Sequence, residues 1–247
     1  MYGLKESPAE QVNLTGTSDI LLICEHASHF IPESFSNLGL TEEECLSHIG
    51  WDIGAADLAK KLSQQLDASL ILQRYSRLLY DCNRPPNELS AIPPLSEVTV
   101  IPGNSGLTAE QRDYRVQRVY QPFHEAIDTH IKDRKKAGRR TIIVTIHSFT
   151  PTFKGQVRTV ELGVICDEGN DYAKRFYQQA QALSQHDIRI NEPYGPSDPV
   201  LHMVTRHGTD NHIPNVMLEV RNDLIKHANG QQEWAQLIGT ALSQIQG

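Results

Sequence analysis

Three apolar segments of this 247-residue chain end in side chains that can perform chemistry, namely DILLIC, TIIVTI and NVMLEV. The side chains at or near these ends are Glu25, His26, His147 and Glu219. In an open α/β sheet, the ligand crevice lies outside the carboxyl ends of the strands, so residues far apart in sequence can meet there. The sequence therefore predicts one site assembled from three strand ends.

The two histidines suggest a metal centre. Two neutral imidazoles and one carboxylate, with a fourth position open to water, form a common catalytic zinc site. We therefore predict one zinc ion held by His26 and His147. The alternative is that each imidazole only caps a strand by a hydrogen bond to backbone, since histidine has several uses.

The third ligand is less well defined by the sequence. Asp52, in HIGWDIGA, is the preferred candidate, although aspartate is also a favoured helix N-cap. Glu25 adjoins His26, and neighbours on a strand point to opposite faces, so it fits a carboxylate that orients a ligand or serves in reserve. His29, three residues after His26, is a further candidate.

Glu219 is predicted to be the general base. A carboxylate beside a metal can take the proton of an attacking water and return it to the leaving nitrogen. An unpaired acid inside an apolar run is costly to bury, so the alternative is a salt bridge from Glu219 to Arg221 or another cation.

The segment RYSRLLYDCNRPP contains Arg74, Arg77 and Arg84, whose guanidinium groups suit bidentate capture of a carboxylate. An acidic substrate is the resulting prediction, with Arg77 also a candidate to stabilise an oxyanion. A pair between Asp81 and Arg84 that stiffens the turn is the alternative. TRHG is a weaker signal for a polar substrate loop and contributes two further candidates, Arg206 and His207.

Apolar runs and helical periodicity alternate along the chain, which predicts an α/β fold with a sheet covered on both faces. A long loop extends to about Gly106. The predicted strands are 19–24, 69–73, 77–81, 141–147, 161–166 and 215–220. Two helices are predicted to begin at capping boxes, at Thr41 and at Thr108. Further helical periodicity ends near residue 67, spans 170–184 and begins again near 231.

Composition limits the remaining functions. The net charge of −7 provides no broad cationic surface for nucleic acid. The four scattered cysteines predict free thiols, and no run approaches the roughly 20 apolar residues of a membrane span. We expect a cytoplasmic protein without a membrane partner, with one domain over 1–247 that includes a loosely ordered polar leader at 1–18. A homo-oligomer is one of the oligomeric states that the sequence leaves open.

Several separated motifs, taken together, resemble the N-formylglutamate amidohydrolase (deformylase) family. They are CEHAS, WDIGA, QRYSRLLYDCNRP, IHSFTP, RHG and LEVRNDLI, in that order between residues 24 and 225. The resemblance implies a three-layer α/β/α sandwich with a mixed, mostly parallel sheet, related to the zinc carboxypeptidases. It also implies a substrate that is a small N-acylated amino acid.

The same resemblance implies roles for individual residues. His26 and His147 look like the metal ligands, Glu219 like the base, and Asn83 with Arg84 like the pair that binds the substrate carboxylate. His29 stands where the carboxypeptidases have a glutamate ligand, which favours Asp52 as the acidic ligand. Asp81 is a candidate to orient the metal ligands.

Two rival functions remain at this stage. One is a zinc peptidase or amidase that acts on a larger substrate such as a cell-wall peptide, which the long loop would admit or exclude. The other is a ligand-binding member of the fold without catalysis. Serine hydrolysis is disfavoured because Ser28 and Ser148 lack the GxSxG motif.

Overall fold

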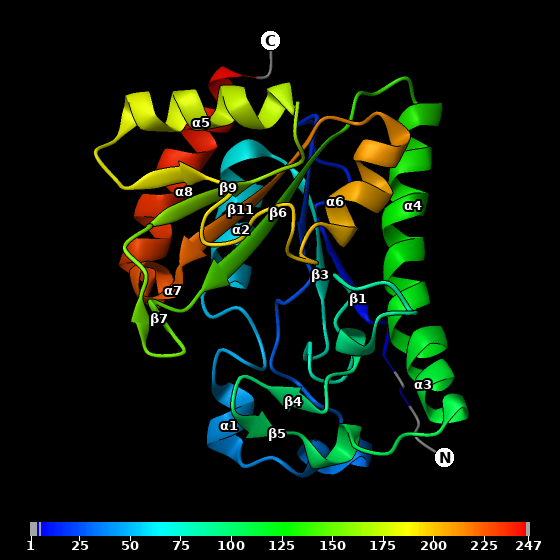
Figure 1. Ribbon diagram of the computed structural model, residues 1–247. Coiled ribbons are helices and arrows are strands. Elements are labelled where there is room, and N and C mark those ends of the chain that lie inside the picture. Colours follow the sequence, from blue (N-terminus) through cyan, green and yellow to red (C-terminus); the bar gives the residue numbers. More distant parts are fainter. Residues whose placement is uncertain (1–3, 5, 246–247) are drawn as a thin grey trace.

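A seven-stranded sheet forms the centre of the computed structural model, which describes residues 4 and 6–245 (Figure 1). In spatial order the strands are β1 (Ala9–Val12), β3 (Ser69–Gln73), β2 (Ile20–Cys24), β6 (Ile142–Phe149), β11 (Asn215–Arg221), β9 (Leu162–Ile165) and β10 (Ile188–Ile190). The pairs β3–β2, β2–β6, β6–β11 and β9–β10 are parallel. The pairs β1–β3 and β11–β9 are antiparallel. The predicted mixed, mostly parallel sheet is confirmed.

Helices cover both faces of this sheet, as a buried, largely parallel sheet requires. On one face lie α2 (Ala55–Leu66), α5 (Asp171–Leu183), α7 (Asn222–Ile225) and α8 (Ala228–Gln244). On the other lie α3 (Ala109–Arg115), α4 (Gln121–Lys136) and α6 (His202–His207). Successive side chains of β2 point to opposite faces of the sheet, so Leu22 packs in the core under α2, α5 and α8, and Leu21 and Ile23 pack in the core under α4. The predicted three-layer arrangement is confirmed.

Shorter elements lie in the connections. The helical ones are η1 (Glu33–Gly39), α1 (Glu42–Leu46), η2 (Leu89–Ala91), η3 (Pro102–Asn104) and η5 (Thr209–Asn211). Two hairpins consist of β4 (Leu95–Ser96) with β5 (Thr99–Val100) and β7 (Thr152–Phe153) with β8 (Gln156–Val157). The predicted long loop therefore contains the first hairpin, which lies with α1 below the sheet in Figure 1.

Local signals in the sequence place most helices correctly. Both predicted capping boxes are present, at Thr41 with Glu44 and at Thr108 with Gln111. The helix after Thr108 is continuous from α3 into α4, with a π-helical turn, Val116–Tyr120, between them. The capping residues satisfy backbone N–H groups that the first helical turn leaves without partners.

The predicted strand over 77–81 is wrong, because this segment is a turn. The Leu79 amide donates to the Ser76 carbonyl at 2.9 Å, and the Leu78 amide donates to the Ser76 side-chain oxygen at 3.1 Å. These bonds direct Arg77 and Asp81 to the same side, where their side chains form an ion pair. Apolar residues alone did not reveal this local hydrogen bonding.

The polar N-terminal segment contributes more than a leader. Residues 9–12 form β1 and pair with β3, so this part of the predicted leader belongs to the sheet. Residues 1–3 and 5 lie outside the described residues. Strand β1 was missed because it is a short polar edge strand whose exposed face carries Gln11, and such strands have no apolar signature.

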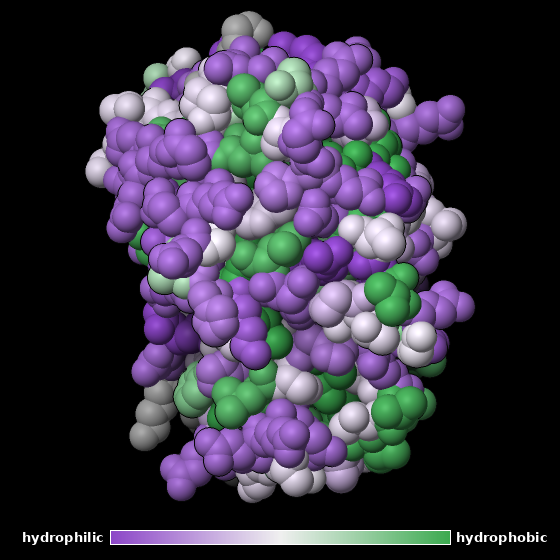
Figure 2. Space-filling model, turned by 90° about the vertical axis from the view of Figure 1, so that its left-hand side faces the viewer, coloured by the Kyte–Doolittle hydropathy of each residue, from purple (hydrophilic) through white to green (hydrophobic). Residues whose placement is uncertain are grey.

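The molecular surface is mainly polar on the side of α5 and α8. Figure 2 shows hydrophilic side chains over most of this face, interrupted by separate hydrophobic patches. Among the described residues, no helix combines the length and apolar character needed to cross a membrane. The four cysteines are free, as predicted, and the side chains of all four are buried.

The turn before α2 depends on Gly54, which has a φ of +81° and caps the helix. A Cβ at this position would lie 2.2 Å from the Ile225 carbonyl oxygen. We expect Gly54→Ala to lower the free energy of unfolding by about 2 kcal/mol or more, because a left-handed conformation and a backbone clash combine. Denaturant titration measures this change.

Gly106→Ala is the matched control, since Gly106 has a φ of +65° but an added Cβ would meet nothing within 4 Å. It should cost only about 1 kcal/mol. Equal losses in the two variants would contradict the role assigned to the close approach of Ile225.

Candidate metal centre and active site

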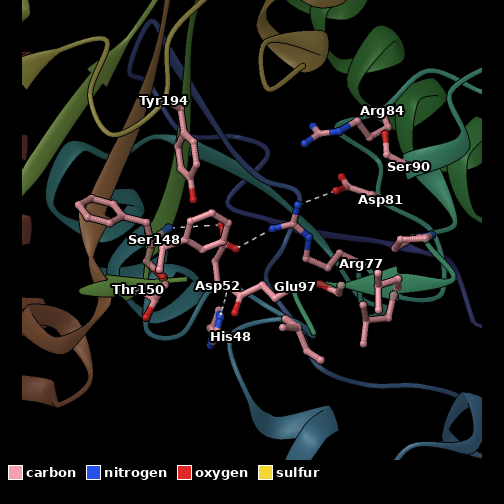
Figure 3. A pocket seen from close by; sticks show the side chains of 17 residues that line it. His48, Asp52, Arg77, Asp81, Arg84, Ser90, Glu97, Ser148, Thr150 and Tyr194 are labelled. Atoms are coloured by element: carbon pink, nitrogen blue, oxygen red, sulfur yellow. Dashed lines mark hydrogen bonds and ion pairs between the residues drawn. The ribbon is translucent and has the colours of Figure 1, made fainter. Parts of the chain in front are cut away.

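A pocket of about 300 Å³ lies beside the carboxyl end of β6 (Figure 3). Asp52, Arg77, Asp81 and Ser148 line it, and a smaller chamber of about 100 Å³ shares several of these walls. The chamber is lined by His26, Asp52, Arg77, Asn83, Arg84, Ser148, Tyr194, Val200, Met217 and Glu219. The predicted convergence of strand ends is therefore observed at this chamber.

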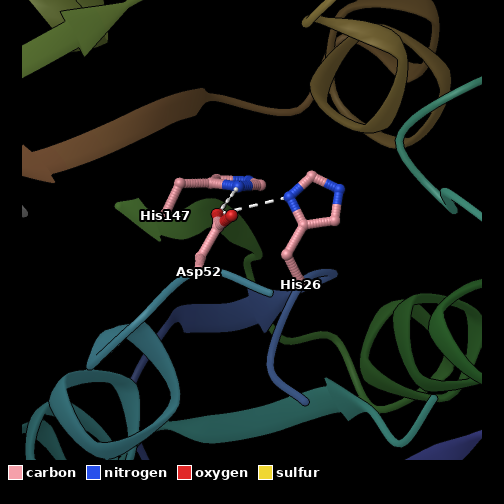
Figure 4. Close-up of side chains that lie close together, drawn as sticks. All are labelled: His26, Asp52 and His147. Atoms are coloured by element: carbon pink, nitrogen blue, oxygen red, sulfur yellow. Dashed lines mark hydrogen bonds and ion pairs between the residues drawn. The ribbon is translucent and has the colours of Figure 1, made fainter. Parts of the chain in front are cut away.

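Three of the predicted residues form a buried cluster (Figure 4). Potential ligand atoms of His26, Asp52 and His147 all lie within 4.8 Å of one another. The Asp52 Oδ2 atom lies 3.2 Å from His26 Nδ1 and 2.9 Å from His147 Nδ1. Two imidazole nitrogens and a carboxylate oxygen thus face a common point, as a metal ion would require.

Adjacent elements bring this cluster together. His26 follows β2 directly, and His147 lies on β6, the parallel neighbour of β2. The Asp52 amide donates to the His26 carbonyl at 2.9 Å, and the Ser148 amide donates to Asp52 Oδ2 at 3.3 Å. Gly54, not Asp52, caps α2, so the Asp52 carboxylate is turned to the imidazoles.

The outer nitrogen of each imidazole faces another buried carboxylate. His26 Nε2 lies 2.8 Å from Asp81 Oδ1, and His147 Nε2 lies 3.1 Å from Glu25 Oε2. Carboxylates in this position fix ring orientation and increase the basicity of a metal-binding imidazole. Glu25 and Asp81, which the sequence analysis named as candidate orienting groups, each lie next to one imidazole.

Arg77 joins the two aspartates of this network. Its Nη2 atom donates to Asp81 Oδ2 at 2.6 Å, and its Nη1 atom donates to Asp52 Oδ1 at 3.4 Å. Asp81 therefore pairs with Arg77, and the alternative pair with Arg84 does not form. The main contacts of Arg77 are with carboxylates of the cluster.

The electrostatics of the cluster favour a cation. Burial and Arg77 oppose protonation of His26, but Asp81 and Asp52 outweigh them and raise its pKa. Burial likewise opposes protonation of His147, yet Glu25 and Asp52 raise its pKa well above the ordinary value. Burial would raise the pKa of Asp52, but the two imidazoles hold it far below its usual range. The site thus attracts positive charge, and metal ions compete with protons for such ligands.

Glu219 lies beside the cluster on β11, directly paired with His147 of β6. Its side chain is buried, and its Oε2 atom has no hydrogen-bond partner among the described residues. The alternative pair with Arg221 is absent, because Arg221 Nε bonds to Asp223 at 2.8 Å. Burial raises the pKa of Glu219 to about 7, with His147 opposing and Asp52 reinforcing the shift. A carboxyl group with this pKa can accept and release a proton near neutral pH.

Four other predicted site residues either have side chains that are already hydrogen-bonded or lie outside the chamber. Asn83 lines it, but its amide donates to the Val200 carbonyl at 2.6 Å and accepts from the Met203 amide at 2.9 Å. His29 is exposed and contacts Trp51, outside the His/Asp/His cluster.

Arg206 and His207, predicted as substrate-binding residues, lie on α6 and line neither of these two pockets. His207 Nε2 lies 2.7 Å from His124 Nδ1 of α4, and His207 Nδ1 lies 3.0 Å from Asp128 Oδ1. Arg206 pairs with the same aspartate at 3.5 Å. The short helix α6 turns these polar residues toward α4, which the tetrapeptide alone did not reveal.

Sequence reasoning missed several polar residues of the pocket, among them His48, Glu97 and Tyr194. The first two form an ion pair at 2.8 Å at the pocket wall. Tyr194 lies between β10 and α6 in a segment without regular periodicity. Such loop residues carry no strand-end signal that would have identified them.

Two imidazoles, a carboxylate and a buried glutamate at strand ends of an α/β/α fold form a site suited to metal-assisted hydrolysis. A sequence model of one family, described as N-formylglutamate amidohydrolase, matches residues 18–226. The chain therefore belongs to the N-formylglutamate amidohydrolase family. It is an enzyme of the class that hydrolyses amides.

Solved structures agree with this fold. A gene product from Agrobacterium tumefaciens has a TM-score of 0.94 and 41% identity, over 98% of this chain and 97% of its own. An N-formylglutamate amidohydrolase from Ralstonia eutropha has a TM-score of 0.69 and 14% identity, over 97% of each chain. At the latter identity the similarity concerns the fold alone. The comparison with curated proteins gives no match.

The raised pKa values predict how stability of the metal-free protein varies with pH. A histidine with a raised folded-state pKa stabilises fully below its ordinary pKa of 6.5 and loses this contribution as pH rises through the folded value. The raised pKa of Glu219 likewise makes its contribution to stability fall as pH rises. The lowered pKa values of Asp52 and Asp81 make their contributions fall only in acid. The melting temperature of chelator-treated protein should therefore fall above pH 6.5.

Metal-loaded protein should not show this fall, because its ligands are already deprotonated. His147→Gln should reduce the pH dependence of the chelated protein. His227→Gln, at an exposed histidine beside α8, is the matched control and should preserve it. Identical melting curves against pH with and without chelator would contradict the assignment of the cluster.

Proposed function

We propose that this protein is a zinc-dependent amidohydrolase that removes the formyl group from an acidic N-formyl amino acid, such as N-formyl-L-glutamate. The observation that carries the proposal is the chamber of about 100 Å³ that His26, Asp52 and Glu219 line together. Family membership supports the reaction class. The products would be formate and the free amino acid.

The donor set fits zinc. His26, His147 and Asp52 supply two nitrogens and one oxygen, which leaves a tetrahedral position for water or substrate. The carboxylates of Glu25, Asp52, Asp81 and Glu219 are all buried around the imidazoles. A divalent cation would offset this negative charge. A bound zinc ion would polarise the amide carbonyl and lower the pKa of water to about 7.

Glu219 would carry the proton through the reaction. Its carboxylate takes a proton from water as the water oxygen adds to the formyl carbon. It then gives that proton to the amide nitrogen as the C–N bond breaks, and the carboxylate is restored. Its buried, unpartnered Oε2 atom and a pKa of about 7 support this cycle.

Arg84 would bind the substrate carboxylate. It lines both the chamber and the outer pocket, and no carboxylate pairs with it among the described residues. Its Nη1 atom donates to the Asn83 carbonyl at 2.7 Å, which leaves other guanidinium donors for a substrate. Asn83 would hold the segment around Val200, and Arg77 would orient Asp52 and Asp81.

The outer pocket supports a second candidate function. Its volume of about 300 Å³ leaves room beyond a formyl group, and residues of the long loop, including Ser90 and Ser96, line it. A longer N-acyl group or a peptide amide would fit this space. Rates on formyl, acetyl and longer N-acyl forms of one amino acid distinguish the two candidates.

Glu219→Gln tests the base. The amide keeps the shape of the side chain but accepts no proton, so kcat should fall by at least about 10²-fold to 10⁴-fold while zinc content is retained. Steady-state kinetics and elemental analysis measure both quantities. Glu125→Gln, on the exposed face of α4, should leave kcat unchanged. Full activity in Glu219→Gln would disprove the assignment.

Arg84→Ala tests the carboxylate site. Loss of the guanidinium should raise KM for an N-formyl amino acid by about 10-fold or more, since charge-assisted hydrogen bonds contribute roughly 1.5–3 kcal/mol each. The α-amide of the same substrate should not discriminate between wild type and variant. Arg74→Ala is the control, because Arg74 pairs with Glu6 outside the pocket. An unchanged KM in Arg84→Ala would rule out this contact.

A further inference from the structure

Tyr194 is the one tyrosine among the residues that line the chamber and the outer pocket. In Figure 3 its ring extends into the pocket, with its hydroxyl end toward the space between Ser148 and Arg77. Burial and the nearby Glu219 carboxylate raise the pKa of Tyr194, so the phenol keeps its proton at neutral pH. The side chain thus brings a hydroxyl group to the reacting centre.

Arg158 determines which way this hydroxyl group can donate. The Arg158 Nη1 atom donates to the Tyr194 oxygen at 3.3 Å. A guanidinium group has no acceptor, so the phenolic oxygen must accept this bond. The hydroxyl hydrogen makes no other hydrogen bond within the described part of the chain, which leaves it available to a substrate in the chamber.

Arg158 is itself held in place by aromatic rings. Its guanidinium carbon lies 4.5 Å from the ring centre of Phe153, 5.1 Å from that of Tyr194 and 5.7 Å from that of Phe149. Cation–π contacts of this kind contribute about 0.5–2 kcal/mol each. The Arg158 amide also donates to the Pro151 carbonyl at 2.8 Å.

The segment that carries Tyr194 is seated closely on β9. A Cβ at Gly163 would lie 2.2 Å from the Glu192 carbonyl oxygen, so only glycine permits this approach. The Asn191 amide donates to the Val164 carbonyl at 3.0 Å, and Asn191 Oδ1 accepts from the Cys166 amide at 2.9 Å. The backbone before Tyr194 is thus fixed relative to the sheet.

We propose that Tyr194 is a catalytic residue whose hydroxyl group donates a hydrogen bond to the oxyanion formed when water adds to the amide carbonyl. Arg158 is a positioning residue that orients this hydroxyl group. The inference rests on the proposed amidohydrolase reaction, and Tyr194 transfers no proton in it. Arg77 also lines the chamber, and its Nη1 and Nη2 atoms each donate to an aspartate, Asp52 and Asp81, so Tyr194 would add a neutral donor beside it.

Tyr194→Phe provides the test, because it removes the hydroxyl group and keeps the ring that contacts Arg158. With zinc-loaded protein and an N-formyl amino acid, kcat should fall by about 10²-fold to 10³-fold, as for other lost oxyanion donors. KM and zinc content should stay within about twofold, because ground-state binding does not use this bond. Tyr177→Phe on α5 is the matched control and should match wild type.

Each outcome separates the two proposals. A wild-type protein without turnover overturns both of them. An active wild type with unchanged kcat in Tyr194→Phe overturns only the hydrogen bond to the oxyanion. A rise in KM with kcat unchanged also overturns it, because the hydroxyl group would then bind ground state and transition state equally.

Arg158→Met tests the positioning role through a double-mutant cycle. It should lower kcat by itself, yet add less than about twofold in the Tyr194→Phe background, since both changes remove one interaction. Melting temperatures of all four proteins monitor folding. Independent, multiplicative losses in the double variant would show that Arg158 does not act through Tyr194.

Discussion

The carboxylate of Asp52 is the group on which the rest of the site depends. It lies within 3.2 Å of both His26 and His147 and accepts a hydrogen bond from the Ser148 amide. A buried carboxylate is costly unless charges and donors surround it. The backbone amide of Asp52 donates a hydrogen bond to the His26 carbonyl and so connects the turn before α2 to the end of β2. The positions of the imidazoles and of this helix are therefore linked.

Acidic and basic side chains alternate with distance from the Asp52 carboxylate. Each imidazole lies between Asp52 and a second acid, Asp81 or Glu25, and Arg77 bonds to both aspartates. The acids make the site attractive to a cation and fix the rings before any ligand binds, which limits reorganisation during catalysis. At the edge of this network, Glu219 keeps a carboxylate oxygen without a hydrogen-bond partner among the described residues, and the proposed proton transfer would use this oxygen.

The residues around the chamber come from both the strands and the loops of the fold. His147 and Glu219 lie on β6 and β11, and His26 directly follows β2, whereas turns and loops supply Asp52, Arg84 and Tyr194. Rigid strands hold distances that the reaction needs, and loops can vary in shape without loss of the core. In the proposed function, selectivity for the substrate would depend mainly on these loop segments, whose sequence has little periodicity.

The sequence alone determined the apolar strands β2, β6 and β11, both capping boxes and the strand-end positions of His26, His147 and Glu219, because burial and capping leave local patterns. Only the tertiary structure showed that Gly54 caps α2 and that the Asp52 carboxylate faces the two imidazoles, since a helix cap and a metal ligand look the same in sequence. It also showed that residues 77–81 form a turn, that Arg206 and His207 pair with Asp128 outside the chamber, and that Tyr194 lines the chamber. These outcomes depend on contacts between distant segments, and such contacts leave no signal in local residue order.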